Sequence, residues 1–129
     1  MKKALLILVF SIYILSSCEK DETYTSVTGT WQCVEVSSVH TPNPYFVDIM
    51  RDANDSTLLK IDNFYNMGYG KEIYARIDAY DISIQSNLYG FSIVGEAKVA
   101  RDFKTIEWEY EVDDGSGLID YVTANYSRN

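Results

Sequence analysis

The chain has 129 residues, of which 47% are hydrophobic and 14% aromatic, and its 11 basic and 19 acidic residues give a formal net charge of −8. Once the export signal described below is set aside, this length predicts one domain. An acidic surface of this kind repels nucleic acid and anionic lipid headgroups, so we expect neither as a binding partner.

Residues 1–17 have the pattern of an export signal. Two lysines precede an apolar run from Ala4 to Leu15, which is too short to span a bilayer as a mature helix. The segment ends in Leu15-Ser-Ser-Cys18 and resembles the lipobox of bacterial lipoproteins. This resemblance implies that residues 1–17 are removed and that Cys18 is acylated, and several acyl chains on one residue anchor a protein stably. The alternative is an ordinary secretory signal with an incidental cysteine.

Residues 18–26 form a predicted acidic tether. Glu19, Asp21 and Glu22 follow the cysteine directly. The stretch resembles the short acidic tags that send some lipoproteins of gram-negative bacteria to the outer face of the outer membrane. Glu19 also differs from the aspartate that is typical of retention in the inner membrane. We therefore expect a lipid anchor in the outer membrane, facing either the periplasm or the outside.

Residues 27–129 are predicted to be all-β, with about eight antiparallel strands and short connections. The expected strands are 27–39, 45–51, 58–64, 72–78, 80–85, 91–100, 104–112 and 118–127. Ile106, Trp108, Tyr110 and Val112 share one face of their strand, and glutamates occupy the other. Eight short strands with one dry face each close into an up-and-down barrel or stack as a β-sandwich.

A tripeptide near the start of this domain favours the barrel. Gly29-Thr30-Trp31 resembles the Gly-X-Trp signature of the calycins, which include the lipocalins, and Arg128 stands where that group has a basic residue. The resemblance implies that Trp31 closes one end of the barrel and that Arg128 lies across its ring, a contact that is favourable by about 0.5–2 kcal/mol. More narrowly, the chain is similar to the lipocalin-like lipoproteins of gram-negative bacteria. It departs from secreted lipocalins in its shortness and in lacking their C-terminal helix and their second and third motifs.

No motif points to an enzyme, a metal site or a cofactor. The single histidine, His40, lies beside a proline-rich loop and is predicted to be exposed, and Cys33 is predicted to be a small residue of the core or its rim. Asp52, Asn54 and Ser56 match the start of a calcium loop, but the glycine and the glutamate that complete such a loop are missing.

The aromatic content is the remaining signal, with 11 tyrosines and two tryptophans. Most of these rings are expected in the core or filling the lumen, but some could line an open mouth for a ligand. The candidates are Tyr80, Phe91, Trp108 and Tyr110 in strands, and Tyr65, Tyr69, Tyr89 and Met67 in loops. The sequence therefore favours a non-catalytic, membrane-anchored barrel that binds a small apolar or glycan-derived ligand. The alternatives are a protein-interaction or inhibitor-like module of an envelope complex and, third, an enzyme of unfamiliar type.

Overall fold

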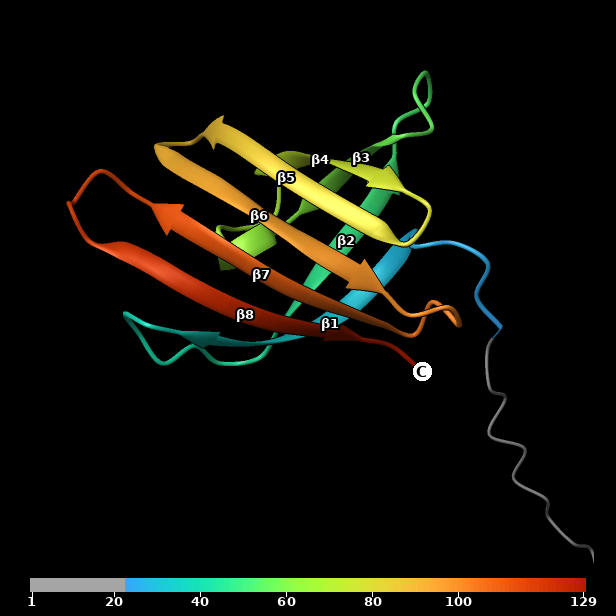
Figure 1. The fold of residues 1–129 in the computed structure, drawn as a ribbon, viewed down its shortest axis with the longest axis horizontal. Coiled ribbons are helices and arrows are strands. Elements are labelled where there is room, and N and C mark those ends of the chain that lie inside the picture. The colour runs from blue at the N-terminus through green and yellow to red at the C-terminus, as the bar shows by residue number, and fades with distance from the viewer. Residues whose placement is uncertain (1–22) are drawn as a thin grey trace, which may run out of the picture.

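The computed structural model describes residues 23–129, which form a closed barrel of eight antiparallel strands (Figure 1). The strands are β1 (Gly29–Ser37), β2 (Tyr45–Arg51), β3 (Leu58–Asp62), β4 (Glu72–Asp78), β5 (Asp81–Leu88), β6 (Phe91–Val99), β7 (Thr105–Asp113) and β8 (Ile119–Ser127). Each strand pairs with its neighbours in the chain, and β1 also pairs with β8. The predicted up-and-down barrel is therefore confirmed, and the sandwich is excluded.

The predicted signal peptide, Cys18 and the first part of the tether lie outside the described residues. Within residues 23–129, no helix is long and apolar enough to cross a membrane. The one helical element among them is a single 3-10 turn, η1 (Phe64–Asn66), between β3 and β4.

The two-residue alternation of the sequence sets the inside and the outside of the barrel. In β7, Ile106, Trp108, Tyr110 and Val112 are buried and the three glutamates are exposed, as predicted. The same alternation holds along β4, β5 and β8. Because the sheet closes on itself, it leaves no unpaired edge, and each strand hides its apolar face in one shared core.

Several predicted strand boundaries are wrong. The expected strand 58–64 stops at Asp62, because Asn63 adopts a left-handed conformation (φ 63°) and turns the chain into η1. The expected strand 80–85 extends to Leu88. Its turn consists of Tyr89 and Gly90 alone, with φ values of 57° and 79°, the positive values that a two-residue hairpin turn of type I′ requires. The other differences are shifts of one or two residues at strand ends.

The barrel has two different ends. At the end that we call the clasp end, β1 begins and β8 finishes, so both ends of the described chain lie there, on the same side of Figure 1. At the opposite end, which we call the far end, lie η1 and the connections β1–β2, β5–β6 and β7–β8. Any tether that precedes residue 23 therefore enters the barrel at the clasp end.

Arg128 joins the two chain ends. Its guanidinium carbon lies 3.9 Å from the ring centroid of Trp31 and 3.8 Å from that of Tyr24. The guanidinium also donates hydrogen bonds to three backbone carbonyl groups, those of Ser26, Thr28 and Phe103. The indole of Trp31 in turn donates to the carbonyl oxygen of Val27 at 2.9 Å. The contact between Trp31 and Arg128 is the one expected from the sequence.

Gly95 marks a close approach between β6 and β7. A Cβ atom at this position would lie 2.3 Å from the Cβ of Tyr110 and 2.4 Å from the carbonyl oxygen of Glu109. Backbone atoms of a paired strand move only at a cost, so we expect Gly95→Ala to lower the free energy of unfolding by about 2 kcal/mol, the usual scale of overpacking. Urea denaturation measures this, with Ser83→Ala on the exposed face of β5 as a near-neutral control. Equal midpoints for the two variants would contradict the tight approach.

Candidate functional site

Side chains fill the lumen of the barrel. The largest of them are Trp31, Phe64, Trp108 and Tyr126, all essentially inaccessible to solvent. Phe64 enters from η1, and its ring centroid lies 5.3 Å from that of Trp108 and 4.8 Å from that of Tyr110. Phe64 therefore plugs the lumen from the far end, and Trp108 and Tyr110 are core residues rather than the walls of an open cavity.

The predicted ligand-binding residues are distributed over both ends of the barrel. Tyr65 is the centre of a small aromatic cluster at the far end, with ring centroids 6.1 Å from Phe91 and 6.2 Å from Tyr110. Tyr80 packs at the clasp end, 5.5 Å from Phe103. The remaining loop candidates also lie toward the far end: Tyr69 and Tyr89 are exposed, and Met67 is half-buried against the core.

The hollow at the predicted mouth is small. It has a volume of about 40 Å³ and is bordered by Tyr65, Asp120 and the β7–β8 connection. One water molecule occupies about 30 Å³ in the liquid, so this hollow has no room for a drug-sized ligand.

Glu35 is a buried acid that the sequence reasoning missed. The residue is 7% exposed, and its carboxylate accepts hydrogen bonds from the hydroxyl groups of Tyr45 at 2.7 Å and Tyr110 at 2.9 Å. Burial raises the pKa of both tyrosines, so they remain neutral donors. The signal was present in the sequence, because the alternation from Trp31 through Cys33 puts Glu35 on the inner face of β1.

Asp120, Ser37 and His40 come together at the far end, but they are not arranged as a catalytic triad. The Ser37 hydroxyl lies 2.7 Å from both carboxylate oxygens of Asp120, to which it donates, and it accepts from the backbone amides of Val39 and His40. His40 directs the same nitrogen, Nδ1, at Ser37 and at Asp120. A triad needs one imidazole nitrogen for the acid and the other for the serine, so this cluster fastens the β1–β2 connection to β8.

Asp120 makes a testable contribution to stability. It is 3% exposed; burial alone raises its pKa, but hydrogen bonds from Tyr65, Ser37 and the amide of Ser38 outweigh this, so the pKa is lowered. A lowered pKa stabilises the fold above the unfolded value, which is about 3.9, and the effect is lost as the pH falls through the folded value. We expect Asp120→Asn to cost about 2 kcal/mol at pH 7 and less below pH 4.

Urea denaturation of this variant at the two pH values measures the difference. Asp78→Asn, at an exposed carboxylate at the end of β4, is the control and is expected to change stability by less than about 0.5 kcal/mol. A cost for Asp120→Asn that stays constant down to acid pH would contradict the assigned role.

Three further polar groups lie in the core. Burial raises the pKa of the Cys33 thiol to about 12, so it is protonated and unreactive at neutral pH. The indole nitrogen of Trp108 and the hydroxyl of Tyr126 are buried with no hydrogen-bond partner among residues 23–129. Their rings are neighbours, with centroids 5.5 Å apart. Two neighbouring buried donors without a hydrogen-bond partner destabilise this part of the core.

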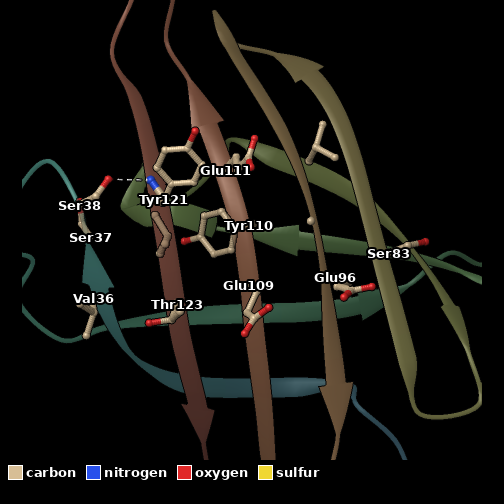
Figure 2. A pocket seen from close by; sticks show the side chains of 13 residues that line it. Val36, Ser37, Ser38, Ser83, Glu96, Glu109, Tyr110, Glu111, Tyr121 and Thr123 are labelled. Atoms are coloured by element: carbon tan, nitrogen blue, oxygen red, sulfur yellow. Dashed lines mark hydrogen bonds between the residues drawn. The ribbon is translucent and has the colours of Figure 1, made fainter.

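A much larger hollow lies on the outside of the barrel, with a volume of about 750 Å³. We call it the outer groove and define it by the exposed side chains that line it: Val36, Ser38, Ser83, Val94, Glu96, Glu109, Glu111, Tyr121 and Thr123. These residues come from β1, β5, β6, β7 and β8 and from the start of the β1–β2 connection, and Figure 2 labels all of them except Val94. None of these exposed residues is among the ligand residues expected from the sequence, which predicted the glutamates of β7 to point to solvent. The buried Tyr110, which is one of the expected ligand residues, also borders the hollow.

No family model matches the chain, and no curated protein matches it either. The functional argument therefore depends on the geometry of the barrel and its groove. Within the described part of the chain, no three histidine, cysteine, aspartate or glutamate side chains are grouped so as to hold a metal ion.

Proposed function

We propose that this chain is a non-catalytic, lipid-anchored lipoprotein of the outer membrane, similar to the lipocalin-like lipoproteins, and that it binds another envelope protein on the outside of its barrel. The filled lumen is the observation that supports binding on the outside. Trp31, Phe64, Trp108 and Tyr126 occupy the space where a lipocalin-type ligand would sit, while the outer groove provides a hollow of about 750 Å³. An eight-stranded barrel is just wide enough to be filled by its own side chains.

The lipobox-like Leu15-Ser-Ser-Cys18 and the acidic tether support the anchor. Mass spectrometry of the purified protein tests it, since an acylated Cys18 adds the mass of a diacylglycerol and a fatty acid to a chain that begins at that residue. Cys18→Ser is expected to abolish the modification and to release the protein from the membrane fraction. An unmodified N-terminus in the wild type would remove the anchor from the proposal.

Site-specific photo-crosslinking in intact cells tests binding at the outer groove. A photoreactive residue at Thr123, which lines the groove, is expected to give one discrete adduct with an envelope protein. Thr105 is the matched control, because it is exposed on the outer face of β7 but lies at the clasp end. Adducts of equal yield at both positions, or none at Thr123, would contradict the proposed interface.

A small apolar or glycan-derived ligand inside the barrel is the second candidate. The unpaired donors of Trp108 and Tyr126 favour it, because a polar ligand that displaced Phe64 could accept their hydrogen bonds. Titration of the tryptophan fluorescence with lipids, sterols, haem and oligosaccharides tests this candidate, since both tryptophans lie in the lumen. A flat response to all of them removes it.

A further inference from the structure

We propose that the outer groove binds an extended basic segment of the partner protein, in which lysine or arginine side chains alternate with apolar ones. This inference rests on the proposed function and deepens it by naming the chemistry of the partner. Four observations support it: like charges face each other in the groove, no cation of residues 23–129 forms an ion pair with them, apolar side chains are exposed beside them, and the barrel has no free edge.

The like charges lie on neighbouring strands. Glu96 of β6 and Glu109 of β7 are directly opposite each other in the pairing register, and Glu111 follows on the same face of β7. Side chains at opposed positions have Cβ atoms about 4.5–5.5 Å apart, and like charges there destabilise a sheet. Figure 2 shows the three glutamates on these strands, around the groove. A cation bound near Glu96 and Glu109 would therefore reduce the repulsion between the two carboxylates.

Within residues 23–129, no basic side chain forms an ion pair with these carboxylates. The nearest basic residue along β6 is Lys98, on the same face as Glu96. Its ammonium group forms its ion pair with Asp81, and it interacts with the charge of Glu96 only as a weaker, secondary partner. The groove therefore presents three carboxylates to whatever docks there.

Apolar side chains lie next to the carboxylates. Val36, Val94 and Tyr121 have exposed fractions of 68%, 55% and 58%. Val94 stands opposite Glu111 across β6 and β7, and Tyr121 stands opposite Glu111 across β7 and β8. Glu111 therefore lies between two apolar side chains, and a segment that places a cation over Glu111 would bring its own apolar side chains against Val94 on one side and Tyr121 on the other. Exposed apolar side chains next to charges are thus available for contact with a partner.

The closed sheet decides the mode of binding. A partner strand cannot add to this barrel, because every strand already has two neighbours. Recognition must use side chains on the outer face, and the open shape of the hollow fits an extended chain segment better than an enclosed small molecule. Nucleic acid and anionic lipid are repelled by the same carboxylates.

The anchor would leave the groove accessible. Tyr24 contacts Arg128 at the clasp end, and only five residues lie between it and Cys18, so the tether reaches at most about 20 Å from the lipid. Glu111 and Tyr121 lie in the halves of β7 and β8 that are nearer the far end. This part of the groove therefore lies away from the clasp end, where the tether enters the barrel, and a partner protein can reach it.

Peptide binding to the full-length lipoprotein in neutral detergent tests the inference. The probe is a short fluorescein-labelled peptide rich in lysine and leucine, read by fluorescence anisotropy at low and physiological salt. We expect the triple variant Glu96→Gln/Glu109→Gln/Glu111→Gln to bind about tenfold more weakly, as three exposed charge pairs of modest strength would give. The control Glu72→Gln/Asp78→Asn/Glu107→Gln removes three charges outside the groove and is expected to change binding less than about twofold.

Three further measurements separate the proposed recognition from simple attraction between opposite charges. Acetylation of the peptide's lysines is expected to weaken binding, and so is Tyr121→Ala, since the inference requires both charge and an apolar contact. Equal loss in the two triple variants would show attraction to net charge alone and overturn the inference, as would equal affinity for spermine, a polycation without apolar side chains. If the peptide fails but a Thr123 crosslink still forms in cells, the basic segment is wrong while the proposed function stands; failure of both removes both.

Discussion

Replacing Phe64 with alanine is expected to lower the free energy of unfolding by about 3–5 kcal/mol, the largest effect of any substitution considered for this barrel. The side chain is completely buried, and its ring packs against those of Trp108 and Tyr110. Removal of the ring leaves a cavity in the lumen that the barrel wall cannot close, because the strands are held by paired backbones on both sides. Urea denaturation followed by tryptophan fluorescence measures the loss, since Trp108 reports directly on the site.

Two control variants separate the plug from a general loss of an aromatic ring. Phe64→Leu keeps most of the volume and is expected to cost less than about 1.5 kcal/mol. Phe46→Ala removes a ring that is 53% exposed on β2 and is expected to cost far less than Phe64→Ala. The alanine variant at position 64 is also expected to bind small apolar molecules such as benzene, which the wild type excludes. A cost below about 1 kcal/mol, with no binding of benzene, would show that η1 does not plug the lumen.

The general fold could be predicted because alternation is a local property. Along β7, apolar residues and glutamates alternate from Ile106 to Val112. This period predicts a strand with one buried face, whichever strands it pairs with. Closure of the sheet is not local, since a sandwich produces the same alternation. It was the pairing of Trp31 with Arg128, implied by the calycin resemblance, that favoured the barrel.

Neither the position of Phe64 in the lumen nor the outer groove could be predicted from the sequence, and the reasons differ. Phe64 enters the lumen only because Asn63 and Tyr65 adopt positive φ values of 63° and 55°, which residues other than glycine rarely do and which no sequence pattern indicated here. The groove depends on pairing register, because a shift of one residue between β6 and β7 would separate Glu96 from Glu109 and turn one of them inward. Register follows from the exact length of the connection between the two strands, and the predicted ends of both were wrong by one residue.

Arg128→Ala is expected to lower the free energy of unfolding by about 3 kcal/mol, because several favourable contacts converge on one guanidinium group. The stacking of Arg128 on Trp31 and Tyr24 contributes on the order of 1 kcal/mol. Each hydrogen bond from the guanidinium to a backbone carbonyl oxygen also contributes about 1 kcal/mol, because partial exposure to solvent weakens it. The loss is measured as the shift of the urea midpoint at constant slope.

Two further variants identify the part of Arg128 that matters. Arg128→Lys keeps the charge but loses the planar fork that reaches the carbonyl oxygens of Ser26, Thr28 and Phe103 together, so it is expected to recover less than half of the lost stability. Arg101→Ala is the matched control, because the guanidinium of Arg101 lies 5.3 Å from the ring of Tyr80 at the same end of the barrel and the residue is exposed. This variant is expected to lower the free energy of unfolding by less than about 1 kcal/mol. Because Arg128 joins residues 24–28 to the last strand, its loss is also expected to make the tether segment more accessible to proteases than the barrel itself. If Arg128→Ala and Arg101→Ala prove equally mild, the two chain ends are held by strand pairing alone and the clasp has no part in closing the barrel.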